Sequence, residues 1–438
     1  MNIFDLSDVK IEEKSFKNYD ILDSDFVFKD NLRLLVLTIR INSAKAKISL
    51  IEILNDFENS KFTFTYSNYK YDVNISFGLI NISSSKINLL VRNIVRRDIS
   101  TGKFKFSLFN VSNLILQNTK HIPCGGVRQS LLLFNIENIS WALEDTRFLE
   151  KRDKNNFMLN GLLASDTISN YSDIKSQMFY ICNIISFITR KDVCCMESYD
   201  NDGILIETFK YKAEPFDING EIINIFAHSS ISEFISKTYK IYNEDKEWWN
   251  ITLSYFKEIR LANSLQAKMI LACILFDCIA RKFLPPIEKT IDSNLQRKRT
   301  NILKLFDDKL SEILDNWDKG RSKKLFGTIA GWNSSRTLLE SMRDLSAIYK
   351  VPELFKGMPR IRGALAHNGI FADNSDLEKN LFAYQELDLF LVILVLRKFG
   401  YEGKFTHPFI QNSEMSFLDL KELQDNIKLS EFNKMQVS

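Results

Sequence analysis

The chain has 438 residues, which exceeds the size at which one hydrophobic core usually stops growing, so we expect two domains. Hydrophobic residues make up 45% and charged residues 26% of the chain, and these ordinary proportions exclude a wholly disordered or fibrous protein. The net charge of +3 lacks the strong basic excess common in nucleic-acid-binding proteins, so any contact with a nucleic acid must be local.

The N-terminus and the apolar runs predict a cytoplasmic protein. The first residues, MNIFDLSDVKIEEKSF, are acidic where a signal peptide is basic and contain no apolar stretch, so export is not expected. The longest apolar runs, such as Met269–Phe276 and Leu389–Leu396, are far shorter than a membrane span, so we expect no membrane association. In the cytoplasm the six cysteines would be reduced thiols. Their spacing is not that of a usual metal site, and we expect neither a metal nor a cofactor.

Residues 1–225 carry the signals of an antiparallel β domain. Apolar and polar residues alternate in segments rich in β-branched and aromatic side chains, separated by clusters of Asn, Ser, Asp and Gly. These segments are Leu32–Ile41, Phe62–Tyr66, Tyr71–Phe77, Phe104–Leu108 and Leu131–Ile136. A helix is expected near residues 172–190, and Asp202-Gly203 is typical of a hairpin turn. We predict a β-rich domain arranged as a sandwich or barrel.

From about residue 229 the apolar spacing becomes helical. Ser230 followed by Glu233 is a capping-box pattern and predicts a helix start. Further helices are expected from Asn263 or Ser264 to before Pro285, from Leu303 to Trp317, from Leu338 to Tyr349, and from a second capping box at Ser375 to about Phe399. The predicted fold class is therefore α+β, with an all-α bundle over residues 229–400 and a C-terminal extension over 401–438.

The segment before the last predicted helix carries the strongest functional signal. Pro359 suits the first position of a helix and Asn368-Gly369 suits its termination, so Arg360–His367 is predicted to be one short helix. Arg362 and His367 are five residues apart, about 140° around an ideal helix, whereas Arg360 and His367 are seven apart and nearly eclipsed. This geometry does not choose between the two arginines.

The segment Arg362-Gly363-Ala364-Leu365-Ala366-His367 resembles the Arg-x4-6-His motif of HEPN domains, helical bundles in which the motif stands just before the final long helix. Asn368-Gly369 also fits, because a glycine often follows the family histidine. With a β-rich domain ahead of the bundle, the chain is similar to the ApeA-like HEPN proteins of bacterial anti-phage defence. The resemblance is firm over residues 229–400 and loose before them. Gly363 departs from the family, which usually has Asn or another polar residue there.

The resemblance implies a metal-independent endoribonuclease that cleaves tRNA during abortive infection. His367 would move a proton while Arg362 holds the phosphate, and attack by the 2′-hydroxyl would leave a 2′,3′-cyclic phosphate. Arg360 and Asn368 would be accessory phosphate- or RNA-binding residues. The run Arg297-Lys298-Arg299 would either contact RNA or form a solvated helix face, and Asp277 would either pair with a motif arginine or face water.

The resemblance also implies partners. HEPN sites lie in a cleft shared by two protomers, so a homodimer through the helical domain is expected, with the N-terminal domain as a sensor or regulator that responds to a phage-derived trigger. The alternative is a non-catalytic HEPN module that serves dimerisation, RNA binding or partner binding, and the glycine at position 363 favours it. The two hypotheses differ in whether His367 is needed.

Overall fold

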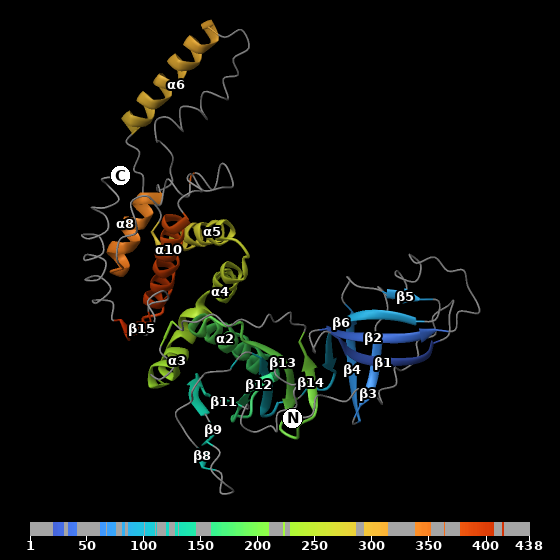
Figure 1. The fold of residues 1–438 in the computed structure, drawn as a ribbon. Helices are drawn as coiled ribbons and strands as arrows, with labels where there is room; N and C mark the ends of the chain where they lie inside the picture. Colours follow the sequence, from blue (N-terminus) through green and yellow to red (C-terminus); the bar gives the residue numbers. More distant parts are fainter. Residues whose placement is uncertain are drawn as a thin grey trace. The chain divides into compact units, whose positions relative to one another are not determined.

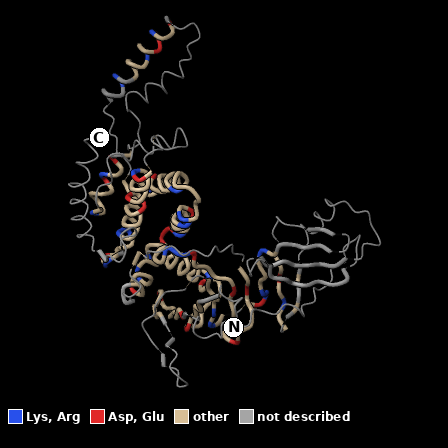
Figure 2. The backbone as a smooth tube through the Cα atoms, in the orientation of Figure 1, with Lys and Arg blue, Asp and Glu red and all other residues tan. Residues whose placement is uncertain are grey.

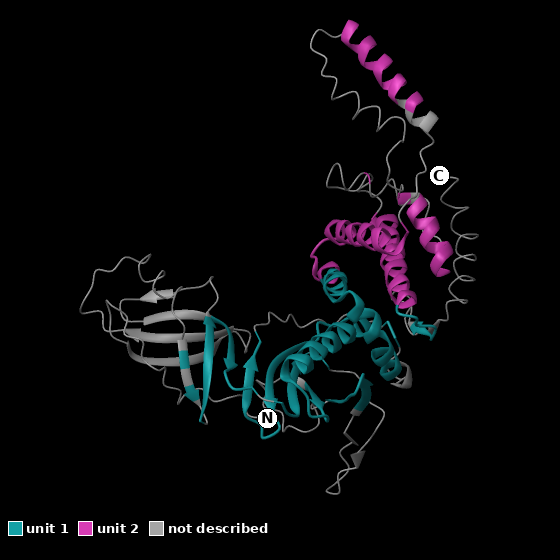
Figure 3. Cartoon of the chain, turned by 180° about the vertical axis from the view of Figure 1, so that it is seen from behind, with its two compact units in different colours: residues 1–257, 399–419 teal, residues 258–398, 420–438 magenta. Residues whose placement is uncertain are grey.

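The structure, a computed structural model of the chain, divides into two compact units (Figure 3). Unit 1 comprises Met1–Lys257 and Phe399–Asp419, and unit 2 comprises Glu258–Lys398 and Leu420–Ser438. The structure describes residues 21–29, 34–41, 62–66, 68–75, 81–83, 86–99, 101–109, 111, 120–121, 128–129, 131–145, 159–209, 222–223, 228–285, 293–313, 338–351, 363, 377–406 and 414–415.

Unit 1 is built on an antiparallel sheet (Figure 1). The described strands pair in the order β1-β2-β6-β14-β13-β7-β12-β11-β10, with β4 and β5 also beside β6 and β3 beside β4. The strands are β1 Ile21–Lys29, β2 Leu34–Ile41, β3 Phe62–Tyr66, β4 Tyr69–Ile75, β5 Asn81–Ser83, β6 Lys86–Arg96, β7 Phe104–Phe109, β10 Leu131–Ile136, β11 Ile139–Asp145, β12 Leu159–Ser165, β13 Cys194–Asp200 and β14 Leu205–Thr208. Two small sheets pair β8 Lys120–His121 with β9 Arg128–Gln129, and β15 Phe405–Thr406 with β16 Glu414–Met415.

The prediction of an antiparallel, β-rich N-terminal half is confirmed. Each of the five predicted strand segments overlaps a strand, namely β2, β3, β4, β7 or β10. The predicted hairpin at Asp202-Gly203 is also confirmed, because β13 and β14 are joined there and Gly203 has φ of +79°, a backbone region that favours glycine. The pairing forms one continuous path, which does not by itself define a sandwich or a barrel.

Strand β6 joins the two parts of the sheet. Its first half pairs with β2, as Leu90 does with Val36, and its second half pairs with β4, as Val91 does with Ile75. The same second half lies beside β14 through the pairing of Glu207 with Val95. This arrangement brings the second half of β6 close to β14, although more than 100 residues separate the two strands in the chain.

Helix α2, Tyr171–Thr189, packs against the sheet and confirms the helix predicted near residues 172–190. Asn170 caps it by accepting a hydrogen bond from the backbone N–H of Ser172 at 2.9 Å. The indole N–H of Trp141, on β11, donates to Gln177 of α2 at 2.9 Å. A stripe of apolar side chains at three- and four-residue spacing is buried in the packing of this helix, formed by Ile174, Met178, Ile181 and Ile185.

Helices α3, His228–Glu244, and α4, Lys246–Leu261, follow in the chain. The hydroxyl of Tyr180 on α2 donates to the backbone carbonyl of Ile235 on α3 at 2.6 Å. Helix α3 and most of α4 belong to unit 1, together with the sheet. The predicted division into domains 1–225 and 229–400 stays a prediction. Ser230 is the third residue of α3, so the helix begins three residues earlier than a cap at Ser230 predicts. The N–H groups of the whole first turn lack partners within the helix. A Ser-x-x-Glu pattern can therefore also occur inside that turn and does not fix the first helical residue.

Gly161 of β12 lies too close to Val111 for any other residue to fit without movement. A Cβ at Gly161 would stand 2.5 Å from Cγ2 and 2.8 Å from Cβ of the fully buried Val111. We expect Gly161→Ala to lower the free energy of unfolding by about 1–3 kcal/mol, because overpacking displaces neighbours. Urea denaturation measures this change. Gly102→Ala is the control, since its new methyl meets Phe104 at an ordinary 3.7 Å, and equal stabilities of the two variants would contradict the expectation.

Unit 2 is helical in the part of it that the structure describes. Its helices are α5 Leu265–Phe283, α6 Ser293–Ile313, α8 Leu338–Tyr349 and α10 Leu377–Lys398. Ser264 caps α5 by accepting from the N–H of Ala267 at 3.1 Å, and α5 ends before Pro285 as predicted. Helix α10 packs against α5 and α8, and α5 packs against α8. Among the described helices of the chain, none combines the length and apolar character needed to cross a membrane.

The order of these elements confirms the coarse fold class. An antiparallel sheet in the N-terminal half precedes a run of helices, so the chain is α+β. The predicted helices that end at Tyr349 and near Phe399 correspond to α8 and α10. The predicted helix from Leu303 to Trp317 corresponds to α6, whose described part ends at Ile313, and Trp317 lies outside the described residues.

Candidate functional site

The motif residues Arg360, Arg362, His367 and Asn368 lie outside the described residues. Gly363, which stands among them in the chain, is helical and half-buried. A Cβ at Gly363 would have no atom within 4 Å, and its φ is not in the left-handed region. Neither space nor backbone conformation therefore requires glycine at this position.

We expect Gly363→Asn to fold as well as the natural chain and Gly363→Ala to be more stable by up to about 1 kcal/mol, because glycine inside a helix is less favourable than alanine by that amount. Gly400→Ala is the matched control. Gly400 also has open space around it, but its φ is +71°, so alanine there should cost about 1–2 kcal/mol. Urea denaturation compares the variants, and a loss of stability in Gly363→Ala as large as in Gly400→Ala would contradict the expectation.

The predicted basic cluster lies on α6. Arg297 and Lys298 are exposed, and Arg299 belongs to the same helix. Figure 2 shows both basic and acidic residues on α6, and Lys309 pairs with Glu312 at 2.6 Å on this helix. This distribution of charge is that of a solvated helix face that presents some basic side chains.

Asp277 lies on α5, is half-buried and interacts with a neighbouring group. The packed group of helices in unit 2 is α5, α8 and α10, and Asp277 belongs to it, whereas the basic cluster is on α6. The predicted partner of Asp277 is a motif arginine, and Arg360 and Arg362 lie outside the described residues, so this pairing stays a prediction.

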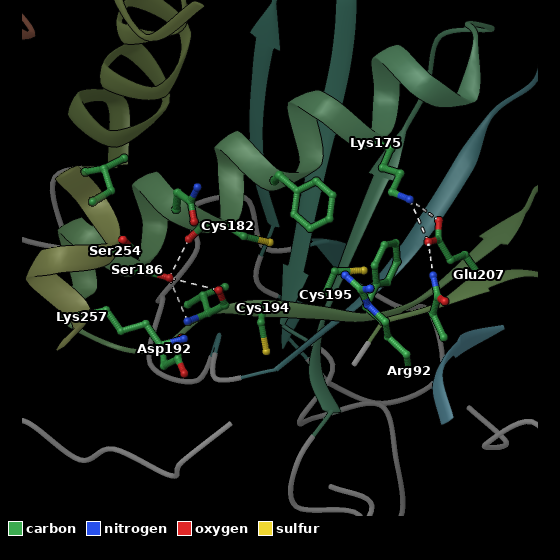
Figure 4. Close-up of a pocket in the computed structure, with 16 residues that line it drawn as sticks. Arg92, Lys175, Cys182, Ser186, Asp192, Cys194, Cys195, Glu207, Ser254 and Lys257 are labelled. Carbon is green, nitrogen blue, oxygen red and sulfur yellow. Dashed lines mark hydrogen bonds and ion pairs between the residues drawn. The ribbon is translucent and has the colours of Figure 1, made fainter. Parts of the chain in front are cut away.

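A second candidate site, which the sequence analysis does not predict, lies in unit 1 along one face of α2 (Figure 4). It is a pocket of about 430 Å³ lined by residues of α2, β6, β13, β14 and α4. Five lining residues of α2 stand at positions i, i+4, i+7, i+8 and i+11, which share one face of a helix; they are Lys175, Phe179, Cys182, Asn183 and Ser186. Eleven residues of helix rise by about 16 Å, so the pocket is elongated along α2.

A buried carboxylate marks one end of the pocket, which we call the Glu207 end. Glu207 of β14 is only 2% exposed, and Lys175 forms an ion pair with it through Nζ at 2.5 and 2.8 Å from its two oxygens. The hydroxyl of Tyr171 donates to it at 3.0 Å and the amide of Asn93 at 3.2 Å. Burial, and next the charge of Glu207, raise the pKa of Tyr171, so this phenol stays a neutral donor. The carboxylate is therefore fully engaged by protein groups.

Arg92 of β6 also lies at the Glu207 end (Figure 4). Its side chain is exposed, and no carboxylate among the described residues forms an ion pair with it. It differs in this from Arg96 on the same strand, which is 4% exposed and bonds to Asp200 at 2.7 Å. Arg92 is thus a cation at the pocket wall with its donors available for an external acceptor.

The middle of the pocket is apolar. Cys182, Cys194 and Cys195 lie there in Figure 4, between the two charged ends. Burial, and next the nearby charge of Asp192, raise the pKa of Cys182 to about 12, and burial raises the pKa of Cys195. Neutral thiols are poor nucleophiles and poor metal ligands, so these side chains act as small apolar groups. Within the described residues, no three His, Cys, Asp or Glu side chains group as a metal site requires.

The opposite end of the pocket, which we call the Lys257 end, carries a second ion pair. Lys257 of α4 bonds to Asp192 at 2.8 Å, and Asp192 is 5% exposed. The hydroxyl of Ser186 donates to the carbonyl of Cys182 at 2.7 Å and accepts from the N–H of Val193 at 2.9 Å. These bonds fix the loop between α2 and β13, and the Lys257 side chain is 31% exposed.

The signal that could have located this pocket is the polar face of α2. Lys175, Asn183 and Ser186 are polar positions of α2 at one-face spacing, but which strands lie opposite them cannot be read from the sequence of α2. Comparison of the chain with models of protein families, with curated proteins and with solved structures finds no match.

Proposed function

We propose that the chain is a metal-independent endoribonuclease of the HEPN type, with Arg362 and His367 as its catalytic residues. The observation that carries the proposal is the place of the motif, which stands between α8 and α10 and directly before the long last helix of unit 2. Helix α10 packs against α5 and α8, and a packed group of helices is the setting of this motif in the family that the segment resembles. The helical state of Gly363 agrees with the short helix predicted over Arg360–His367.

The proposed reaction is an internal transfer of the RNA phosphate. The 2′-oxygen attacks the adjacent phosphorus, the bond to the 5′-oxygen of the next nucleotide breaks, and the products end in a 2′,3′-cyclic phosphate and a 5′-hydroxyl. His367 would transfer the proton, since imidazole titrates near neutral pH. Arg362 would hold the non-bridging oxygens and stabilise the charge that grows on them. Arg360 and Asn368 would assist in holding the phosphate.

The remaining parts of the proposal concern substrate and assembly. The proposed chemistry selects single-stranded or loop RNA, where the backbone can bend and the bases can separate. The resemblance implies tRNA as the particular substrate, and we propose it on that ground. The exposed Arg297 and Lys298 of α6 would contact its phosphates. A cytoplasmic homodimer through the helical domain, with the N-terminal domain responding to a phage-derived trigger, completes the proposal.

The test is incubation of the purified chain with total bacterial RNA in EDTA, followed by sequencing of new RNA ends. Defined cuts with cyclic-phosphate ends would support the nuclease. The same assay in lysate from phage-infected cells separates an enzyme that awaits its trigger from a module without activity. Absence of cuts in both would favour the non-catalytic HEPN module, for which the specific observation is that Gly363 replaces a polar residue.

A further inference from the structure

We propose that the pocket along α2 in unit 1 binds a nucleoside monophosphate, with the phosphate at Arg92 and the base against the aromatic side chains of the lining. This inference does not depend on the proposed nuclease, because every residue that lines the pocket belongs to unit 1.

The charge of the pocket favours an anion at the Glu207 end. Its lining contains three cations, Arg92, Lys175 and Lys257, and two carboxylates, Asp192 and Glu207, so the net charge is 3 − 2 = +1. Lys175 is paired with Glu207 and Lys257 with Asp192, which leaves the excess on Arg92. A guanidinium binds a phosphate with two parallel hydrogen bonds, so a phosphate is the anion that it recognises best.

The aromatic side chains of the pocket lining favour a planar ring on the ligand. Phe179 of α2 is 42% exposed, a large fraction for a phenyl group, and it lines the pocket. It meets Phe209 edge to face, with ring centroids 5.6 Å apart and an interplanar angle of 87°. An edge-to-face contact leaves the faces of one ring for other contacts, and stacking of a base on such a face is worth about 1–3 kcal/mol.

The length and volume of the pocket suit a ligand that contains both a phosphate and a base. The lining face of α2 extends about 16 Å, enough for a phosphate at one end and a base further along. A volume of about 430 Å³ lies in the usual range for small-molecule sites. At the Lys257 end, the Ser254 hydroxyl and the partly exposed Lys257 ammonium supply polar groups for the edge of a base. The neutral thiols between the ends provide an apolar surface for the ring.

The test is calorimetric titration of the full chain with AMP, GMP, CMP and UMP, with adenosine and inorganic phosphate as the separate halves of the ligand. We expect at least one nucleotide to bind about tenfold more tightly than either half, because both the cation and the rings are used. Inorganic phosphate binding as well as every nucleotide would overturn the role of the rings. No binding of any nucleotide would overturn the proposal.

Two substitutions test whether the nucleotide binds in this pocket. Arg92→Gln should weaken the nucleotide about tenfold or more, whereas Arg97→Gln, an exposed arginine just past the end of β6 and outside the pocket lining, should leave it unchanged. Phe179→Ala should weaken it about fivefold or more, and Ile168→Ala, which removes another exposed apolar side chain of unit 1, should not. All four side chains are exposed, so folding is preserved. Undiminished binding in Arg92→Gln would overturn the assignment.

Discussion

Alanine in place of His367 is expected to reduce RNA cleavage by about 10²- to 10⁴-fold, the range that a positioned proton-transfer group contributes. Under the proposed mechanism no other group is assigned to move the proton of the 2′-hydroxyl, so the loss should appear in the rate of the chemical step. The measurement is the rate at which cyclic-phosphate ends form on one defined RNA. If His367→Ala forms the same ends at the rate of the natural chain, the assignment of His367 as the proton-transfer group is wrong.

The control for this substitution is His228→Ala. His228 begins α3 in unit 1 and has no proposed role in the reaction, so cleavage should continue at the natural rate.

A second comparison chooses between the two arginines that the helical geometry leaves open. Arg362→Ala should lose activity as His367→Ala does, whereas Arg360→Ala, as an accessory residue, should lose less. The reverse order would move the phosphate-binding role to Arg360.

The sequence predicts best those elements whose signals are local. Helix α5 begins after the capping Ser264 and ends before Pro285, and both signals lie within the helix or next to it. The hairpin at Gly203 is equally local, because one turn residue fixes it. Strand β6 was not among the predicted strands, and its two halves pair with different neighbours. Its pairing with β14 joins residues more than 100 positions apart, which no local pattern can give.

The two candidate sites differ in how readily the sequence reveals them, and the reason is again whether their signals are local. The motif Arg362–His367 is contiguous in the chain, so a short pattern is enough to find it. The pocket is assembled from β6, β13, β14, α2 and α4, and its residues look ordinary in the sequence. Glu207 reads as one polar position of a strand, and only the fold shows that it is buried against Lys175. The order of the sheet was therefore the missing information.

Methionine in place of Lys175 is expected to lower the free energy of unfolding of unit 1 by about 3 kcal/mol. Removing one partner of a buried ion pair costs about 3–5 kcal/mol, because the remaining charge is left without compensation. The Glu207 side chain is 3% exposed but that of Lys175 is 31% exposed, so water screens part of the effect and the lower value applies. Urea denaturation followed by far-UV circular dichroism measures the change.

The double variant Lys175→Met with Glu207→Gln should recover most of this loss. Glutamine carries no charge, yet its carbonyl oxygen can still accept from Tyr171 and Asn93, which bond to Glu207 at 3.0 and 3.2 Å. Lys103→Met is the matched control, because Lys103 pairs with Asp166 at 2.6 Å while both side chains are exposed, and it should cost less than about 1 kcal/mol. Equal losses in Lys175→Met and Lys103→Met would mean that Glu207 does not depend on Lys175. In that case the hydrogen bonds of Tyr171 and Asn93 would be enough to stabilise the Glu207 carboxylate. The expected result would instead show that the ion pair with Lys175 stabilises this buried carboxylate beside the proposed phosphate position.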